Sequence, residues 1–412
     1  MTVLQIQNEV PSRNRLIFVA LLLSLVGDIW MGITLPLAIF PVLACLLANR
    51  LRLPPINATP SLLLLSSLGV IVGIQVLSGA PPAGRSDLLV YLPIVYAVLA
   101  LWAASAVDLE DAAVRNALIY GGVSTAVVMF GTAFFAPQDF YFLPSQYIPS
   151  NTEISLETGP DIDAIDGGLE HSVAGAPFYE WKRRLITPLG FSNYLSAFLM
   201  FSCMIALFSR SYAAAIFLGC SVAATGSRFG IAFLVVGFIC WLLYRRGLRS
   251  WVVPCSVVAA TFAGVVTLIA FAPSLRWIPD AASLQVRVDY WRDALVAWSN
   301  SPFIGMPRSY IMEAVRATVF WNPHNAALWI GTLFGAAGLI VYGAYLVTVC
   351  RLAARLSLQS EVWAGVLVGL SLLISMSMVE SIAVSPAFEI LMALLLGVAL
   401  RRSRSEVVEN AA

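Results

Sequence analysis

The sequence has little charge and almost no lysine. Only 11% of its 412 residues are Asp, Glu, Lys or Arg, and Lys182 is the single lysine. The formal net charge is +1, so there is no electrostatic basis for binding nucleic acid. Charged residues this scarce also exclude a soluble protein, because a core of this length could not bury so much apolar surface.

Cysteine and histidine are also scarce. The spacing of the six cysteines fits no metal site, and because all of them fall within apolar stretches, we predict no disulfides. They are Cys45, Cys203, Cys220, Cys240, Cys255 and Cys350. No feature calls for a catalytic metal or another cofactor. Asp161, Asp163 and Asp166 lie close together in a polar segment, which leaves a calcium or magnesium site there as an alternative.

Long apolar runs make up most of the sequence, since 59% of the residues are hydrophobic. A spanning helix needs about 20 mostly apolar residues. We therefore predict an all-α fold, a polytopic transmembrane helical bundle of about twelve spans. The first run lacks a small-residue cleavage site and is interpreted as an anchor rather than a signal peptide. The candidate spans are 15–31, 32–48, 60–79, 88–106, 114–135, 189–209, 211–226, 228–244, 250–273, 325–350, 361–379 and 384–400.

Arginines alternate between the loops in a way that predicts orientation. With the N-terminus inside, the cytoplasmic segments hold most of the arginines, whereas short loops on the other face hold only Arg85 and Arg228. This pattern favours an even number of spans, and both termini are then cytoplasmic. Residues 1–412 are expected to form a single integral membrane domain.

Two long polar segments fall on the outer face. Segment 136–188 is acidic in its middle and is expected to be a solvated periplasmic loop. Segment 274–323 contains an apolar stripe at helical spacing, so a helix is expected there, lying in the membrane interface or against the bundle. The stripe consists of Leu284, Val288, Trp291, Leu295 and Trp298.

The first candidate functional segment is the turn Thr225-Gly226-Ser227-Arg228-Phe229-Gly230. Here Arg228 begins a helix at the outer face, among small residues that allow a ligand to approach closely. Helix N-termini and arginine both suit phosphate oxygens. The alternative is an arginine that snorkels at the membrane boundary.

The second candidate is Trp321-Asn322-Pro323-His324-Asn325, at the outer entrance of span 325–350. The positive end of the helix dipole disfavours imidazolium, which leaves a neutral His324 that can accept a proton from a hydroxyl. The alternative is a structural histidine at a helix cap.

The third candidate is a pair of arginines, Arg287 and Arg292. They flank opposite edges of the apolar stripe, and periodicity does not choose which of them faces the membrane surface. A pairing with Asp289 or Asp293 is the alternative for either.

These motifs together resemble the O-antigen ligase and O-antigen polymerase superfamily. The resemblance covers about residues 184–345, and its motifs are short but occur in the family's order. They are Arg184 with Gly190-Phe191-Ser192-Asn193; Ser227-Arg228; Arg287 and Trp291 with Ser301-Pro302-Phe303-Ile304-Gly305; and His324-Asn325 followed by Gly331, Gly335 and Gly338. The resemblance implies an all-helical glycosyltransferase of the bacterial inner membrane that acts at the periplasmic face, without a nucleotide sugar or a metal.

The implied substrates are a donor glycan carried on undecaprenyl pyrophosphate and a glycan acceptor. Arg228 and Arg287 would hold the pyrophosphate, with Arg184 as a third candidate for this role, and His324 would take the proton from the attacking hydroxyl. Substrate contacts are also expected from Asn193, Ser227, Arg292 and Asn325. A ligase would use a lipid A core sugar as acceptor, and a polymerase would use a growing O-antigen or exopolysaccharide; the motifs leave both open.

A transporter or lipid-linked glycan flippase is the alternative from another class. It requires ionisable residues near the middle of the membrane. The best candidate is Glu389 in the last span, with Glu380 at its outer mouth. The distinctive cations cluster at one face instead, which favours the glycosyltransferase.

Overall fold

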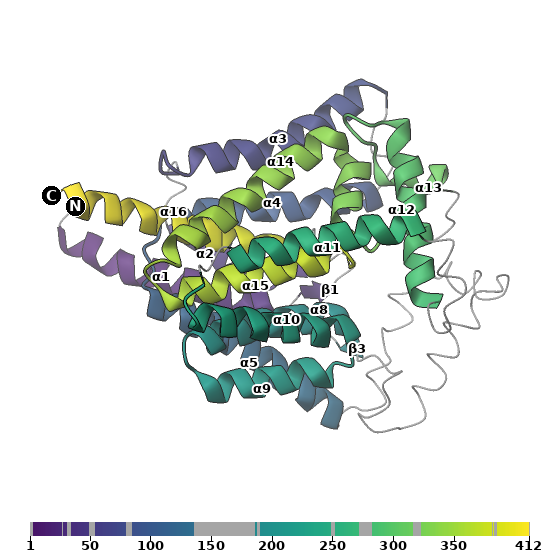
Figure 1. Cartoon of the computed structure of the whole chain (residues 1–412). Helices are drawn as coiled ribbons and strands as arrows, with labels where there is room; N and C mark the ends of the chain where they lie inside the picture. Colours follow the sequence, from purple (N-terminus) through teal and green to yellow (C-terminus); the bar gives the residue numbers. More distant parts are fainter. Residues whose placement is uncertain are drawn as a thin grey trace.

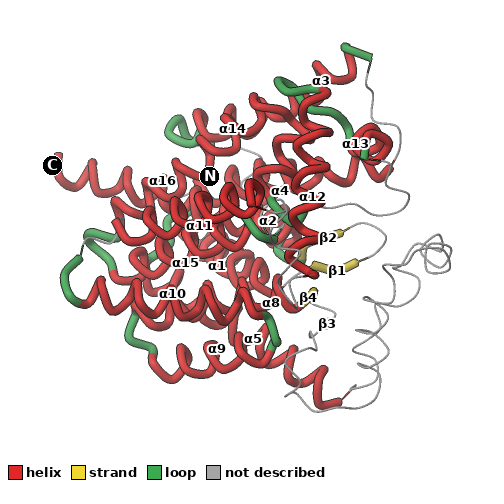
Figure 2. Tube along the Cα trace, turned by 45° about the vertical axis from the view of Figure 1, so that its right-hand side comes forward, coloured by secondary structure: helices red, strands yellow, loops and turns green. Residues whose placement is uncertain are grey.

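The computed structural model is almost entirely helical in the residues that it describes. These are 3–26, 28–30, 34–48, 54–79, 85–135, 186–187, 190–248, 252–271, 282–315, 323–380, 382 and 385–411. The expected all-α class is confirmed (Figures 1 and 2). The predictions for Arg184, for the cation site at 161–166 and for nearly all of loop 136–188 lie outside these residues.

In the described residues, each of the twelve candidate spans overlaps one helix. These helices are α1 (Val3–Val26), α2 (Ile39–Ala48), α3 (Thr59–Leu77), α4 (Arg85–Ser105), α5 (Asp111–Phe135), α8 (Ser192–Phe208), α9 (Tyr212–Ala224), α10 (Arg228–Arg245), α11 (Val252–Phe271), α14 (Ala326–Leu356), α15 (Glu361–Ser377) and α16 (Pro386–Ala411). Within the described residues, four are long and apolar enough to cross a membrane: α3, residues 111–131 of α5, α10 and α14. The count of about twelve crossings stays a prediction.

The first two expected spans are divided differently from the prediction. A short antiparallel hairpin of β1 (Asp28–Trp30) and β2 (Thr34–Pro36) separates α1 from α2. Its strands include Ile29, Trp30 and Thr34, residue types that favour extended backbone, so α2 begins only at Ile39. A second hairpin, β3 (Ile186–Thr187) with β4 (Gly190–Phe191), precedes α8.

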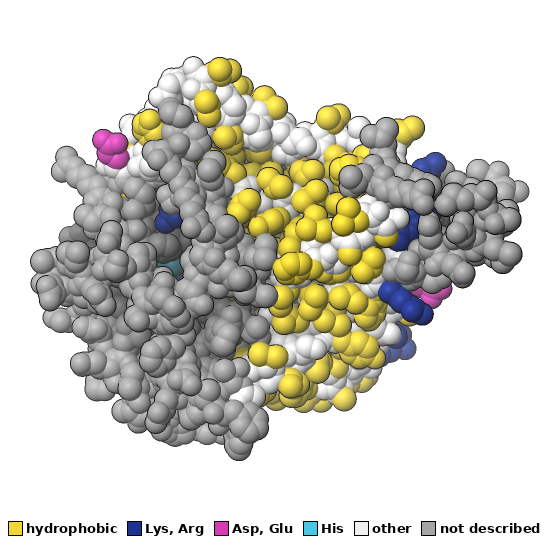
Figure 3. Space-filling view, turned by 180° about the vertical axis from the view of Figure 1, so that it is seen from behind, with side chains coloured by type: hydrophobic (Ala, Val, Ile, Leu, Met, Phe, Trp, Pro, Cys, Tyr) yellow, Lys and Arg dark blue, Asp and Glu magenta, His cyan; other side chains and the backbone are white. Residues whose placement is uncertain are grey.

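The centre of the bundle is formed by α8, α15 and α16. Every residue of α15 from Val362 to Ser377 is buried. Glycines allow close helix contacts: a Cβ on Gly365 of α15 would lie 2.9 Å from the Cα of Ile205 in α8, and one on Gly397 of α16 would lie 2.6 Å from the Cβ of Ala104 in α4. In Figure 3, hydrophobic side chains cover much of the described surface in the middle of the face, as a lipid solvent requires.

The two ends of the bundle differ in chemistry. At the end where the chain termini lie, Glu361 pairs with Arg210 at 2.7 Å and with Arg245 at 3.5 Å. Both hairpins lie at the opposite end (Figure 2), as do the first residues of α8, α10 and α14. The residues proposed from the sequence therefore gather at the end away from Glu361.

Segment 274–323 contains α12 (Ala282–Asn300) and α13 (Arg308–Ala314). The expected helix is confirmed, and α12 packs against α14 while running across the end of the bundle (Figure 1). Its buried face differs from the predicted stripe. Val288 and Trp291 are fully buried, but Leu295 is 38% exposed because Ala294 and Ala297 occupy the buried side instead.

Helix α14 is broken at Gly335, whose φ of +66° and ψ of −165° are not helical. The loop between α12 and α13 fills the break. Gly305 also has a positive φ, +67°, and a Cβ there would lie 2.4 Å from the carbonyl carbon of Leu333. The backbone of Ala336 donates to the carbonyl of Pro302 at 2.8 Å. Two of the glycines in the family motifs therefore permit this close backbone contact.

Gly335→Ala should destabilise the protein strongly. A Cβ at this position would lie 2.2 Å from the carbonyl carbon of Phe303, and the left-handed φ adds strain. Together these effects should lower the free energy of unfolding by at least about 2 kcal/mol. The measurement is the thermal unfolding of detergent-solubilised protein.

Gly343→Ala on the same helix is the matched control, since a Cβ there meets nothing within 4 Å. It should leave stability unchanged or raise it by about 0.5–1 kcal/mol. Equal melting temperatures for the two variants would contradict the described break in α14.

Candidate functional site

One buried carboxylate, Glu380, lies just after α15 and joins three candidate side chains. Its Oε2 accepts hydrogen bonds from Arg287 Nη2 at 2.8 Å and from Asn193 Nδ2 at 2.6 Å. Its Oε1 lies 2.6 Å from His324 Nδ1. We call these four residues the Glu380 cluster. They come from α8, α12, the residue before the N-cap of α14, and the segment after α15, so only the tertiary structure assembles them.

Glu380 is ionised in this environment. Burial by itself would raise the pKa of this carboxyl group, since only 6% of the residue is exposed. The hydrogen bond with His324 and the charge of Arg287, together with Asn193, outweigh burial and hold the pKa below its ordinary value of 4.5. The cluster therefore contains a buried ion pair whose carboxylate also contacts His324 and accepts a hydrogen bond from Asn193.

Arg287 is held rigidly, and the structure selects it over Arg292. Its Nη1 donates to the carbonyl of Val379 at 2.6 Å, and its guanidinium carbon lies 5.0 Å from the centre of the Phe229 ring. Arg292 is five residues further along α12, which turns it about 140° away on the helix. Neither predicted alternative pairing of Arg287 is seen, because its partner is Glu380.

The backbone of His324 has an unusual conformation. Its φ is +47°, a left-handed conformation that histidine adopts more readily than most residues. Asn325 then caps α14: its Oδ1 accepts from Leu328 N at 3.0 Å, and its Nδ2 donates to the carbonyl of Met378 at 2.7 Å. The side chain of His324 is 33% exposed and stacks on Tyr290, with ring centres 6.2 Å apart.

The carboxylate decides which imidazole nitrogen carries the proton. An ionised Glu380 can only accept hydrogen bonds, so the neutral imidazole must carry its proton on Nδ1 to make the 2.6 Å contact. Nε2 is then the basic nitrogen. This is the arrangement in which a carboxylate orients a histidine for accepting a proton.

A chain of hydrogen bonds links the cluster to the start of α10. Asn193 Oδ1 accepts from Ser227 Oγ at 2.8 Å, and Ser227 Oγ accepts in turn from Gly230 N at 3.0 Å as the N-cap of α10. A Cβ on Gly230 would lie 2.5 Å from the Cβ of Ser196, so this approach requires glycine. Arg228, the first residue of α10, is exposed beside this chain.

The predicted residues thus divide into two groups. Asn193, Ser227 and Asn325 are each at most 7% exposed, and their polar atoms bond to other parts of the protein, so they position the site. Arg228 and His324 are accessible. The expectation that the three buried residues contact substrate directly stays a prediction.

Glu380 was missed as a site residue. The sequence places it at the outer mouth of the bundle but gives no partner, so we weighed it only for transport. The available signal was that the carboxylate ends a span at the same face as Arg287 and His324. Glu389 belongs elsewhere: it is buried in α16 and hydrogen-bonds to Tyr342.

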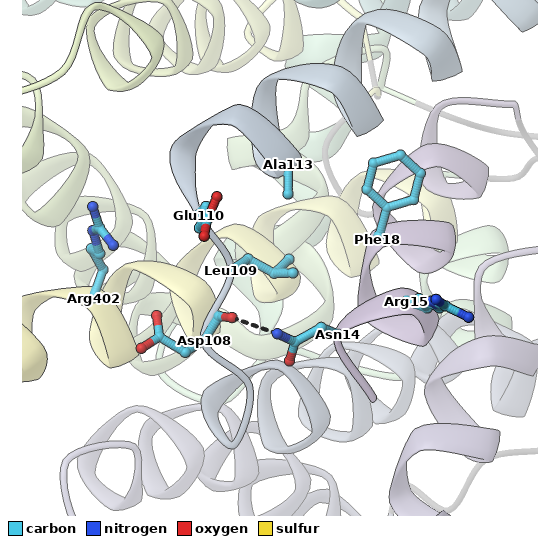
Figure 4. A pocket seen from close by; sticks show the side chains of 8 residues that line it. All are labelled: Asn14, Arg15, Phe18, Asp108, Leu109, Glu110, Ala113 and Arg402. Carbon is cyan, nitrogen blue, oxygen red and sulfur yellow. Dashed lines mark hydrogen bonds between the residues drawn. The ribbon is translucent and has the colours of Figure 1, made fainter. Parts of the chain in front are cut away.

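A pocket of about 500 Å³ lies at the other end of the bundle (Figure 4). It is lined by residues of α1, α16, the turn before α5 and the first turn of α5: Asn14, Arg15, Phe18, Asp108, Leu109, Glu110, Ala113 and Arg402. Arg402 lies 16 residues after the start of α16, which corresponds to about 24 Å along the helix. The pocket is therefore separate from the Glu380 cluster.

Comparison with known families matches residues 213–343 to the family model described as O-antigen ligase. We call this matched segment the O-antigen ligase domain. The match supports the resemblance seen in the sequence and, with the apolar helices, indicates a membrane glycosyltransferase of the O-antigen ligase and polymerase type. No curated protein matches the chain.

The O-antigen ligase domain contains part of the site. Ser227, Arg228, Arg287, His324 and Asn325 lie within it. Asn193 and Glu380 lie outside the matched residues, yet both bond directly to residues of the domain. Helix α8 and the segment after α15 therefore complete the candidate site of the O-antigen ligase domain.

Proposed function

We propose that the protein transfers a glycan from undecaprenyl pyrophosphate to a sugar hydroxyl at the periplasmic face of a bacterial inner membrane. The observation on which this rests is the hydrogen bond between His324 and Glu380, because it leaves a correctly oriented base at an accessible position. The family assignment supplies the reaction class.

The reaction can be written with one base and one leaving group. The acceptor hydroxyl oxygen attacks the anomeric carbon of the donor glycan, and the bond from that carbon to the pyrophosphate oxygen breaks. The bonding electron pair leaves with undecaprenyl pyrophosphate. Nε2 of His324 takes the hydroxyl proton, and the ionised Glu380 stabilises the imidazolium that forms.

The pyrophosphate needs positive charge that the cluster does not supply by itself. Glu380 neutralises Arg287, so this ion pair carries no net charge. Arg228 adds an exposed cation at the N-terminus of α10, where helix amide groups also favour an anion. Arg287 retains further N–H groups for a phosphate oxygen, since the guanidinium has five donors and two are assigned.

The location of the site suits a donor that is carried on a lipid. Helix α12 runs across the end of the bundle, and it holds Arg287 on its buried face. A helix in this orientation suits the membrane interface, where a lipid pyrophosphate would lie. The arginine-rich opposite end then faces the cytoplasm, and the cluster faces the periplasm.

The acceptor separates ligase from polymerase, and we propose the ligase type. A lipid A core sugar would then receive the finished glycan. The assay is the release of undecaprenyl pyrophosphate by purified protein incubated with lipid-linked glycan and either acceptor. No release with either acceptor would contradict the proposed function.

Arg228→Ala should reduce turnover by about 10²–10³-fold, because it removes the exposed cation that stabilises charge growing on the pyrophosphate. Arg228→Lys keeps the charge but loses the paired donors, so it should recover part of the rate. Arg246→Ala, at the far end of α10, is the control and should leave the rate unchanged. Full activity of Arg228→Ala would remove this residue from the site.

A further inference from the structure

Gln75 of α3 is a buried polar residue that the proposed reaction does not use. It is 1% exposed, and its Nε2 donates to two backbone carbonyls, Ile304 and Leu333, both at 2.6 Å. Tyr91 of α4 donates to Gln75 Oε1 at 3.5 Å, so both ends of the amide are engaged. A buried amide that uses both N–H groups on backbone carbonyls of two other segments acts as a clamp.

The two carbonyls belong to the two parts of the break in α14. Leu333 ends the first half of that helix, just before Gly335, and its carbonyl is one that the break deprives of a regular helical partner. Ile304 lies in the loop that fills the break. Phe334 packs edge-on against Tyr91, with ring centres 5.6 Å apart, so α4 braces the same point.

Each clamped segment leads to a residue of the Glu380 cluster. The loop of Ile304 directly follows α12, which holds Arg287. The half-helix of Leu333 begins just after His324. The path from Leu333 to His324 spans nine residues, or about 14 Å along the helix, so a tilt of about 4° at the break would move His324 by about 1 Å. Misplacement of that size can reduce a rate by about 100-fold.

We propose that Gln75 is a positioning residue for glycosyl transfer: by clamping the break in α14 to the α12–α13 loop, it sets the placement of His324 relative to Arg287. The inference rests on the proposed function, and it extends the site to α3, which contributes no residue to the Glu380 cluster.

Gln75→Met tests this role, because methionine keeps a similar volume but donates no hydrogen bond. The expected result is a fall in kcat of about 10–100-fold with KM changed less than about threefold. Hydrogen exchange should rise in residues 301–306 and 326–334 together. Gln75→Glu has nearly the same shape and retains at most one donor, so its kcat should be intermediate.

Thr125→Val is the matched control. Thr125 of α5 is 1% exposed and also donates to a backbone carbonyl of another helix, that of Leu25 at 2.7 Å. Loss of this hydrogen bond in Thr125→Val should lower the melting temperature about as much as Gln75→Met does. It should not change kcat or hydrogen exchange in residues 326–334.

A wild-type kcat in Gln75→Met would overturn the proposal if His324→Ala is inactive in the same assay. The proposal would also be overturned if Thr125→Val lost as much kcat as Gln75→Met while the two variants had the same melting temperature. If wild-type protein itself releases no undecaprenyl pyrophosphate, the proposed function is contradicted instead. Hydrogen exchange then tests the clamp independently of activity. Unchanged exchange in residues 301–306 and 326–334 of Gln75→Met would show that Gln75 does not hold these segments together.

Discussion

His324→Ala should abolish nearly all glycosyl transfer, lowering kcat by about 10²–10⁴-fold. The variant lacks the base that accepts the proton from the acceptor hydroxyl, while Arg228 and Arg287 can still bind the pyrophosphate. KM for the lipid-linked donor should therefore change little. The measurement is steady-state release of undecaprenyl pyrophosphate over a range of donor concentrations.

A second substitution separates chemistry from backbone strain at this position. Alanine tolerates the φ of +47° poorly, whereas asparagine adopts left-handed conformations readily but has no basic nitrogen. His324→Asn should therefore fold like the wild type and remain inactive. His171→Ala, at the only other histidine, is the control and should be fully active. Activity in His324→Asn would show that the imidazole is not the base.

Glu380→Gln should have the second large effect, on both activity and stability. The glutamine amide can donate to Nδ1 of His324, which would move the imidazole proton to Nε2 and remove the base. We expect a loss in kcat of about 10²–10⁴-fold. The buried Arg287 would also lose its counter-charge, at a cost of about 3 kcal/mol in the free energy of unfolding.

Two measurements test these consequences separately. Nitrogen NMR of protein labelled on histidine reports the imidazole tautomer, and the chain has only two histidines to assign. Thermal unfolding reports the stability loss. Glu361→Gln is the matched control, since its pairs with Arg210 and Arg245 are solvent-exposed and should contribute little to stability. An unchanged tautomer with full activity in Glu380→Gln would contradict the assigned role.

The lowered pKa of Glu380 predicts how stability depends on pH. A carboxyl group whose folded-state pKa is below 4.5 stabilises the protein at pH values above 4.5. That contribution is lost as the pH falls through the folded-state pKa. Stability measured from about pH 7 downward should therefore fall below about pH 4.5 in the wild type, and the fall should be smaller in Glu380→Gln. Equal slopes in both proteins would contradict an ionised, stabilised Glu380.

The sequence by itself determined the fold class and the end of the bundle at which the site lies. Long apolar runs require helices in a lipid solvent, and the distribution of arginines distinguishes the two ends. Spacing also located Arg228 and His324 at helix starts, since N-terminal signals such as Ser227 and Asn325 are local. These features depend on neighbouring residues in the chain, which is why they can be recognised before any contact is known.

The tertiary structure alone decided which side chains meet. Periodicity could not choose between Arg287 and Arg292, and the choice follows from where Glu380 lies, 93 residues further along the chain. The hydrogen bonds of Asn193 to Glu380 and to Ser227 also join residues far apart in the sequence, so the sequence does not predict them. The break in α14 and its clamp by Gln75 were also hidden, because they consist of backbone carbonyls facing another helix, and no side-chain pattern records which carbonyl lacks a partner.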